Sequence, residues 1–394
     1  MASVNMKSLR GVAAFVGAAD TAVGKIPGVS ATELCVQAAM QAIEDAGLKK
    51  DDVDGLITCN SMAQPIMYHA EAIAEYMQIF PRYCMSVNTG GGTTFSAMHH
   101  AASAIATGMA ETIVISMADS LRSGMTREQA SKTQSSTGHP LYEQIYGLTV
   151  PAYYALIAQA HMAEYGTTEA HFAEIAVSTR AHAATNPTAQ KRDLITVDDV
   201  INSRMIADPL HLLDCSLVSD GGAAIVLTSA ERAKDLPHDP VYLLGVGEGH
   251  SHEHISQARS LTTSAAVEAG QRTFAMAGSS ISDIDFAQLY DCFTPTVLIE
   301  LEDLGFCEKG QGGEFVAGGA LRPGGSLPVN THGGMLSHCH SGNPGSMFAL
   351  TEAIQQLRHN AGDRQLQKAQ TALLHAQGGI MSSHTAMILA RYHD

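Results

Sequence analysis

The sequence has few basic residues and no long run of them. It contains 23 Lys and Arg against 39 Asp and Glu, which gives a formal net charge of −16. The longest basic runs are Lys49-Lys50 and Lys191-Arg192. Nucleic acids and anionic membranes attract clustered cations, so neither is expected as a partner. The seven cysteines lack CxxC spacing, which favours free thiols in a reducing cytosol.

Targeting and membrane signals are also absent or weak. The short apolar run near the start predicts a first strand rather than a signal peptide, and the final RYHD matches no peroxisomal or retention address. Residues 83–110 carry no formal charge and are long enough to cross a bilayer. Three consecutive glycines, Asn88 and two histidines within them predict instead a strand and a helix buried in protein. We therefore expect a cytoplasmic protein.

The chain carries the same pattern twice, in the same order. The repeated features are VNTGGG at 87–92 and VNTHGG at 329–334, AG at 46–47 and 277–278, and D-[VI]-D at 52–54 and 283–285. A helical stretch precedes the AG turn in each half. Such self-similarity predicts one supersecondary unit that was duplicated and fused. The two equivalent loops should face each other across a pseudo-two-fold axis, where we expect the active site.

Strands and helices alternate in both halves. Strands are predicted at 12–18, 53–58, 83–88, 112–117, 220–227, 241–247, 371–376 and 384–390, and helices at 31–46, 68–78, 92–107 and 262–276. This alternation predicts parallel sheets with right-handed crossovers. Ser30 and Glu33 have the spacing of a capping box at the first helix. Residues 119–206 lose the alternation, which indicates an inserted loop or lid domain.

The expected architecture is a five-layered α/β/α/β/α body, in which two sheets share a central helical layer. The N-terminal half would comprise 1–118 and 207–237, the inserted domain 119–206, and the C-terminal half 238–394. The DGGAAIVL strand at 220–227, the tetrapeptide YDCF at 290–293, VNTHGGMLSHCH at 329–340 and the late Gly378-Gly379 together resemble the thiolase superfamily. The resemblance spans the chain and implies the thiolase fold, with duplicated βαβαβαββ halves. It is nearest to the sterol-carrier-protein-type thiolases and the related lipid-transfer enzymes, which include aldolases.

The resemblance also implies that the thiolase nucleophile is missing. Family thiolases carry a cysteine at the N-terminus of the helix after the third strand, and that position falls on Gly91. Cys84 lies seven residues too early and is expected to be a core thiol. Thr93 and Thr94 are expected to cap the helix rather than to act as nucleophiles. No covalent acyl-enzyme is therefore expected.

The remaining family motifs supply the other candidate site residues. The catalytic histidine falls on His340, and the motif that reads His-Asp-Cys-Phe in the sterol-carrier type begins here with Tyr290. The second thiolase cysteine falls on His375. The candidate catalytic residues are Tyr290, His340, Cys292 and Cys339, and the candidate substrate-binding residues are Gly91, His332, His375, Gly378 and Gly379.

These residues retain the parts of a thiolase site that stabilise an enolate. Backbone N–H groups at Gly91 and near Gly378-Gly379 would serve as oxyanion donors, and Tyr290 with His340 as the acid/base pair. The expected reaction is retro-aldol cleavage of a 3-hydroxyacyl-CoA of lipid or steroid side-chain type. One alternative is an acetyltransferase-like enzyme that uses Cys339 or Cys292. Another is a non-catalytic subunit that holds substrate or has a structural role.

Ligands and partners follow from the same residues. The alternating His250, His252 and His254, like His338 and His340, lack CxxC or HExxH geometry, so no metal is expected. Residues 245–249 lack GxGxxG spacing, so no dinucleotide is expected. Coenzyme A enters only as part of the substrate, and no cofactor is permanently bound. A homodimer through 83–88 is expected, and the resemblance implies a small zinc-ribbon and oligonucleotide-fold subunit that helps to bind acyl-CoA.

Overall fold

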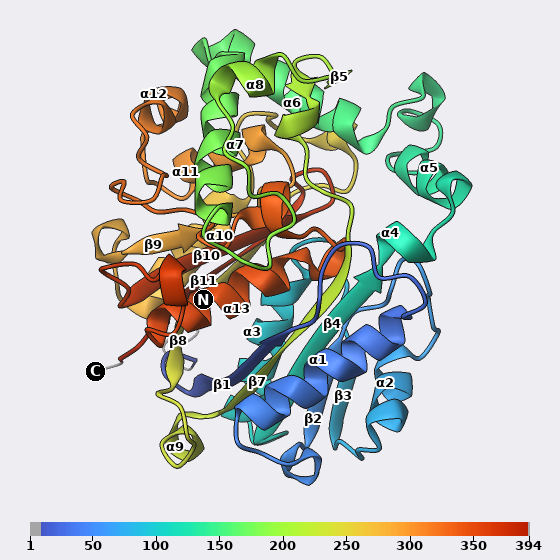
Figure 1. Ribbon diagram of the computed structural model, residues 1–394, viewed down its shortest axis with the longest axis vertical. Coiled ribbons are helices and arrows are strands. Elements are labelled where there is room, and N and C mark those ends of the chain that lie inside the picture. Colours follow the sequence, from blue (N-terminus) through green and yellow to red (C-terminus); the bar gives the residue numbers. More distant parts are fainter. Residues whose placement is uncertain (1–8, 393–394) are drawn as a thin grey trace, which may run out of the picture.

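A single mixed sheet runs through the molecule (Figure 1). The computed structural model describes residues 9–392, so the first eight and last two residues of the predicted halves lie outside the described part. The strand order is β3-β2-β4-β7-β1-β8-β11-β10-β9. The strands are β1 (Ala13–Asp20), β2 (Gly55–Thr58), β3 (Tyr83–Ser86), β4 (Thr112–Ser120), β7 (Asp220–Ser229), β8 (Val241–His250), β9 (Phe286–Gln288), β10 (Thr371–Gly378) and β11 (Ser383–Ala390). A separate small sheet pairs β5 (Met205–Ala207) with β6 (Leu210–His211).

The eight predicted strands are confirmed within a few residues, but the expected pairing is partly wrong. Only β3, β2 and β4 and the pair β9 and β10 are parallel, whereas the other neighbours are antiparallel. The parallel pairs are those joined by helical crossovers, while β7, β1, β8 and β11 reach their places by other connections. The two expected sheets are also continuous, because Ala14 of β1 pairs with Tyr242 of β8.

Thirteen helices within residues 9–392 surround this sheet. They are α1 (Ala31–Asp45), α2 (His69–Met77), α3 (Thr93–Ala106), α4 (Leu121–Gly124), α5 (Arg127–Ser135), α6 (Val150–Tyr165), α7 (Glu169–Ala183), α8 (Val197–Ile201), α9 (Ala230–Ala233), α10 (Ala266–Ala277), α11 (Thr294–Asp303), α12 (Gly312–Ala317) and α13 (Ser346–Leu357). The capping box of α1 is confirmed, since the Glu33 N–H donates to Ser30 Oγ and the Ser30 N–H donates to the Glu33 carboxylate. Helices α3 and α13 contact strands of both halves, so they form the expected central layer.

The repeat is visible in the structure but is not symmetrical. Helices α3 and α13 each follow a VNT segment. The first VNT segment continues from a full edge strand, β3. The second has only an isolated parallel bridge between Val329 and Ala287 of β9. The second copy therefore loses an edge strand and keeps the loop that leads to the site.

Residues 119–206, the predicted insertion, hold the end of β4, helices α4 to α8 and the start of β5. Helices α6 to α8 lie at one end of the molecule, and α5 projects to one side (Figure 1). Strand β4 extends to Ser120, two residues into that range. The uncharged residues 83–110 form β3 and α3. In the part of the chain that the structure describes, no helix has the length and apolar character needed to cross a membrane.

Candidate active site

A cavity of about 270 Å³ lies where loops of the two halves and the insertion meet. It is lined by Gly91, Gln134, Val150, Pro151, Tyr154, Ile206, Leu212, Cys215, Ser216, Leu217, Val218, Tyr290, Cys292, Phe293, His340, Gln377, Gly378 and Gly379. Six of the nine candidate residues are therefore brought together: Gly91, Tyr290, Cys292, His340, Gly378 and Gly379. The other three, Cys339, His332 and His375, lie behind this lining.

Tyr290 and His340 form a hydrogen-bonded pair in the cavity wall. The Tyr290 Oη lies 3.2 Å from Nε2 of His340. Burial raises the pKa of the Tyr290 phenol well above its usual value, with further contributions from Cys292 and Glu300. Burial also lowers the pKa of His340 to about 4. At neutral pH the phenol is thus protonated and the imidazole is neutral, so the phenol donates its proton to Nε2.

The Tyr290 phenol occupies the space next to Gly91. A Cβ placed on Gly91 would lie 2.1 Å from the Tyr290 Oη and 2.4 Å from the carbonyl oxygen of Gln377. These separations are far below van der Waals contact, so no larger residue fits there beside Tyr290. The expectation that Thr93 or Thr94 caps the same helix is wrong, because the N-cap position is Gly92 and no side chain makes a capping hydrogen bond. The Thr93 Oγ1 instead accepts the N–H of Thr89 and donates to the Gly90 carbonyl, which holds the loop before α3.

Two glycine segments touch directly at the cavity floor. A Cβ on Gly378 would lie 1.8 Å from the carbonyl oxygen of Thr89, and one on Gly90 would lie 2.9 Å from Cα of Gly378. Gly90 and Gly379 both have φ of 64°, a left-handed conformation that glycine adopts without strain. Only residues without side chains allow the loop before α3 to pack against the end of β10. Glycines from both halves thereby line one cavity.

The two candidate cysteines are both buried, and burial raises the pKa of each thiol. Cys292 faces the cavity, where Gln377 Nε2 lies 3.3 Å from its sulfur. Cys339 is 0% exposed, and its sulfur lies 3.9 Å from the carbonyl oxygen of Asp220. A nucleophilic cysteine needs a stabilised thiolate, and neither environment supplies one.

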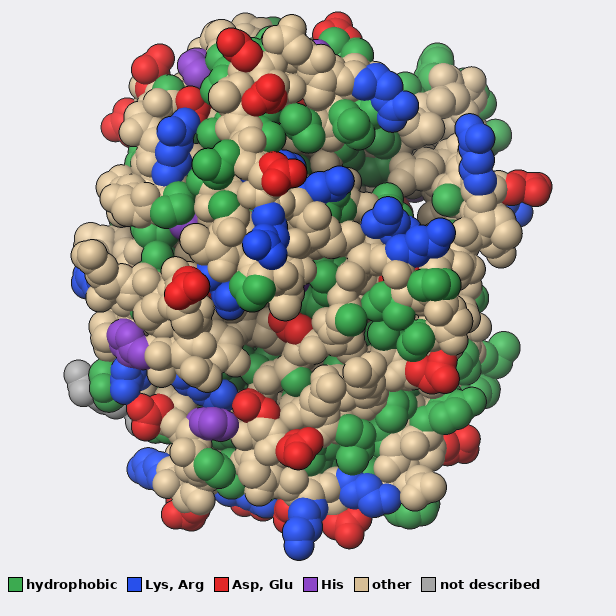
Figure 2. Space-filling model, in the orientation of Figure 1, with side chains coloured by type: hydrophobic (Ala, Val, Ile, Leu, Met, Phe, Trp, Pro, Cys, Tyr) green, Lys and Arg blue, Asp and Glu red, His purple; other side chains and the backbone are tan. Residues whose placement is uncertain are grey.

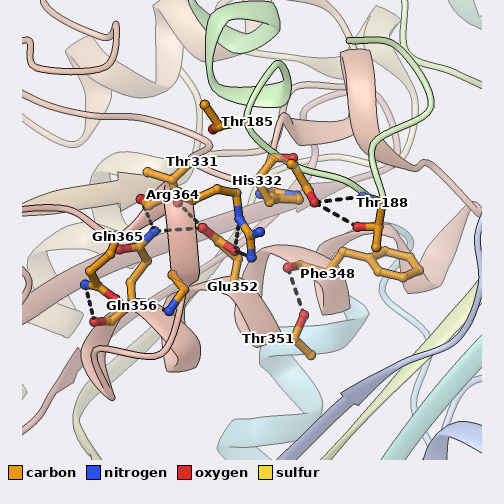
Figure 3. Close-up of polar contacts among 12 residues, drawn as sticks. Thr185, Thr188, Thr331, His332, Phe348, Thr351, Glu352, Gln356, Arg364 and Gln365 are labelled. Carbon is orange, nitrogen blue, oxygen red and sulfur yellow. Dashed lines mark hydrogen bonds and ion pairs between the residues drawn. The ribbon is translucent and has the colours of Figure 1, made fainter.

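His332 and His375 lie in the layer behind the cavity lining. Asn186 of the insertion donates to the His332 carbonyl at 2.7 Å. Next to it, Glu352 of α13 accepts from Thr331 at 2.9 Å and from Arg364 at 2.9 Å (Figure 3). This network anchors the segment that continues to His340. His375 is completely buried beside Glu300 and His384, so neither histidine lines the cavity.

Tyr154 and Gln377 line the cavity but were not predicted as site residues. The Tyr154 hydroxyl donates to the Gly379 carbonyl at 3.0 Å and accepts from Gln377 Nε2 at 2.7 Å. Its ring stacks on Phe293 with centroids 4.4 Å apart. Tyr154 thereby ties the insertion to the glycine loop of β10. The neighbouring tyrosines at 153 and 154 were a visible signal, but nothing in their spacing linked α6 to the C-terminal motifs.

His250, His252 and His254 do not line this cavity in the described part of the chain. Nδ1 of His250 lies 2.7 Å from Ser383 Oγ, and Nε2 of His252 lies 3.0 Å from the Ile380 carbonyl oxygen. Across residues 9–392, no three His, Cys, Asp or Glu side chains are grouped so that they could hold a metal ion.

Comparison with known proteins agrees with this geometry. Residues 13–231 match the family model described as "Thiolase, N-terminal domain", and residues 247–391 match "Thiolase C-terminal domain-like". The chain is 40% identical to a steroid side-chain-cleaving aldolase of Thermomonospora curvata, over 90% of this chain and 92% of the relative. It is 37% identical to the 17-hydroxy-3-oxo-4-pregnene-20-carboxyl-CoA lyase of Mycobacterium tuberculosis, over 89% of this chain and 92% of that relative.

A solved structure described as "Ltp2-ChsH2(DUF35) aldolase" is also similar. It has a TM-score of 0.86 and 37% identity, and the match covers 97% of this chain and 98% of that one. The sequence models, the relatives and the solved structure all extend over nearly the whole chain. The duplicated α/β body and the motifs of its cavity therefore have one explanation: this chain belongs to the thiolase superfamily.

Proposed function

We propose that this chain is a carbon–carbon lyase that cleaves a 3-hydroxyacyl-CoA by a retro-aldol reaction. The observation that carries the proposal is the hydrogen-bonded Tyr290 and His340 pair, placed where Gly91 leaves no room for a nucleophilic side chain. Acyl transfer through a thiolase cysteine has no group to begin it. An acid/base pair beside oxyanion donors suits a reaction that proceeds through an enolate.

The proton path begins at the β-hydroxyl of the substrate. Its proton passes to the Tyr290 oxygen while the phenol proton passes to Nε2 of His340, so no free phenolate is formed. The bond between Cα and Cβ breaks, Cβ becomes a ketone or aldehyde carbonyl, and the electron pair moves through Cα onto the thioester oxygen. Tyr290 and His340 then return one proton to Cα of the enolate, and the acyl-CoA product is released. Because the pKa of His340 is lowered to about 4, its imidazole is neutral at neutral pH and Nε2 has a lone pair that can accept the proton.

Backbone N–H groups at Gly91 and near Gly378-Gly379 would stabilise the enolate oxygen. Preorganised donors of this kind contribute on the order of 10²–10³ each to kcat. Coenzyme A is needed only as part of the substrate, and the two relatives named above support this class, since one is named as a carboxyl-CoA lyase and the other as an aldolase. Val150, Pro151 and Phe293 make the cavity wall apolar, which suits a lipid or steroid side chain.

The phosphates of coenzyme A need cations, and none of the described residues that line the cavity is Lys or Arg. Arg127 and Lys132 stand outside it on α5, the helix that also carries Gln134. Figure 2 shows Lys and Arg side chains over α4 and α5, beside the hollow that separates these helices from α6. We propose that these cations, together with a small zinc-ribbon and oligonucleotide-fold subunit, hold the nucleotide end. The similar solved structure has DUF35 in its description, "Ltp2-ChsH2(DUF35) aldolase".

We further propose a homodimer in the cytoplasm. Strand β3 is an edge of the sheet. Two aromatic side chains that precede it in the chain are exposed, Tyr76 at the end of α2 by 68% and Phe80 in the following loop by 99%. An unpaired edge with apolar neighbours favours pairing with a second copy. All seven cysteines are free thiols, which suits a reducing compartment.

The test is turnover of a branched 3-hydroxyacyl-CoA by single and double variants, with any partner subunit present. Tyr290→Phe and His340→Ala should each lower kcat by roughly 10²-fold or more, and the double variant should be little worse than the worse single one. Tyr153→Phe is the matched control, because it removes another buried hydroxyl, which donates to Thr137. Additive losses would assign separate roles to the pair, and full activity in both singles would favour the substrate-holding subunit.

An acyltransferase that uses Cys292 or Cys339 is the second candidate function, because Cys292 faces the cavity. A stable acyl group on either thiol would favour it over the lyase.

A further inference from the structure

Three completely buried ionisable side chains form a chain directly behind Tyr290. Glu300 lies on α11, His375 on β10 and His384 on β11. One carboxyl oxygen of Glu300, Oε2, lies 3.2 Å from Nδ1 of His375. Nε2 of His375 lies 3.1 Å from Nδ1 of His384, and the two rings stack with centroids 5.2 Å apart. The described residues that line the cavity include none of these three side chains. The proton path proposed above does not use them.

The same carboxyl oxygen is bonded to the catalytic tyrosine. Glu300 Oε2 accepts the main-chain N–H of Tyr290 at 2.9 Å. The residue that carries the phenol is therefore held by a carboxyl group whose other partner is a histidine. This contact fixes the start of the 290–293 turn, from which the phenol reaches His340.

Burial favours the uncharged form of every member of this chain. It raises the pKa of Glu300 well above its usual value, and the nearby Asp303 raises it further. It lowers the pKa of His375 to about 3 and that of His384 well below its usual range. A buried carboxylate without a cationic partner is strongly unfavourable. A protonated carboxyl 3.2 Å from the Nδ1 of a neutral imidazole leaves neither group with an unpaired charge.

We infer that Glu300, His375 and His384 form an uncharged hydrogen-bond chain that positions Tyr290 and keeps negative charge away from its phenol. In this chain the Glu300 hydroxyl donates to Nδ1 of His375, and the Nε2–H of His375 donates to Nδ1 of His384. Glu300 is thus a positioning residue for the proposed reaction, so the inference rests on the proposed function.

The other ionisable groups around Glu300 agree with an uncharged carboxyl. They are Asp303 on α11, and Tyr290, Asp291 and Cys292 after β9, besides the two histidines. Lys309 pairs with Asp303. Burial raises the pKa of Asp291 to about 7, and this residue accepts the N–H groups of Met335 and Leu336. A negative charge on Glu300 would repel any negative charge that develops on the Tyr290 oxygen.

The activity test compares Glu300→Gln with Glu300→Ala. A glutamine whose side-chain oxygen takes the place of Oε2 can accept the Tyr290 N–H without a charge, so it keeps the contact that positions Tyr290. It cannot donate to Nδ1 of His375 from the same atom. We expect Glu300→Gln to keep kcat within about threefold of the wild type with an unchanged pH profile of kcat/KM. Glu300→Ala leaves the Tyr290 N–H unpaired and should lower kcat roughly 10²-fold with little change in KM.

Glu302→Gln is the matched control, because Glu302 lies on the same helix and also contacts a buried histidine, with Oε2 3.0 Å from Nε2 of His161. It has no bond to Tyr290 in the described contacts and should leave kcat unchanged. A pH profile displaced in Glu300→Gln, or a loss as large as that of Glu300→Ala, would mean that Glu300 works as a carboxylate and would overturn the inference. Full activity in Glu300→Ala would also overturn it.

Nitrogen NMR of histidine-labelled protein tests the chain without any turnover. We expect His375 as the neutral Nε2–H tautomer at neutral pH in the wild type. An Nδ1–H tautomer or a protonated ring would contradict the chain. If the expected tautomer is found but no lyase activity is detected, the proposed function fails while the uncharged chain stands.

Discussion

Gly91→Ala is the sharpest test of how the site excludes thiolase chemistry. The added Cβ would lie 2.1 Å from the Tyr290 Oη, a separation that real Cβ atoms do not show, so the phenol must retreat by about 1 Å. The carbonyl oxygen of Gln377, 2.4 Å from the same Cβ, belongs to β10 and cannot easily give way. A displacement of about 1 Å in a catalytic group costs roughly 10²-fold in rate.

The phenol cannot move by that distance and keep its 3.2 Å contact with His340. We therefore expect Gly91→Ala to lower kcat roughly 10²-fold, close to the loss in Tyr290→Phe. The assay is steady-state cleavage of a branched 3-hydroxyacyl-CoA, with thermal unfolding measured in parallel to show that the variant folds.

The neighbouring glycine supplies the control. A Cβ on Gly92 would meet its nearest atom, the Thr89 carbonyl oxygen, at 3.5 Å, which is an ordinary contact. Gly92 has a φ of −73°, which alanine adopts freely. Gly92→Ala should therefore keep nearly full activity. Wild-type activity in Gly91→Ala would refute the reasoning, because it would show that the position of the Tyr290 phenol does not limit the reaction.

Three further outcomes are expected. Intact-protein mass spectrometry after incubation with acetyl-CoA or acetoacetyl-CoA should detect no acyl adduct, since position 91 has no thiol; an adduct on Cys292 or Cys339 would favour the acyltransferase. Sedimentation should give a dimer for the wild type and a monomer for Phe80→Asp, whereas a wild-type monomer stable to dilution would refute the dimer. Burial lowers the pKa of His332 from 6.5 to about 3, so the unfolded state binds its proton first, and stability is lost as pH falls below about 6.5. Relative to His332→Asn, the wild type should lose about 1.4 kcal/mol more unfolding free energy per pH unit in that range, and equal slopes would contradict this.

Much of the fold could be predicted because its signals are local. The apolar runs predicted the strands, and the Ser30 to Glu33 spacing predicted the start of α1, since a capping box needs only four consecutive residues. The direction of pairing could not be predicted in the same way. The direction depends on where each long connection brings the chain back to the sheet. After the long segment that follows β4, the chain returns as β7, which pairs with β4 in the antiparallel direction.

In the candidate site, too, the residues in local motifs could be predicted, and the contacts between distant residues could not. Gly91, Tyr290, Cys292, His340, Gly378 and Gly379 were found by their motifs and are gathered around one cavity. Tyr154 was missed because its link to Gly379 spans 225 residues of sequence. His375 was expected to bind substrate, but the structure places it behind the cavity beside Glu300.

The sequence by itself determined that this chain is a duplicated α/β protein of the thiolase type without the nucleophilic cysteine, because repeats, strand periodicity and residue identity are written in order along the chain. Only the tertiary structure decided that the Tyr290 phenol occupies the space next to Gly91, and that Glu300 joins His375 to the main chain of Tyr290. Those relations join residues tens to hundreds of positions apart. They exist only once packing has brought the two halves together.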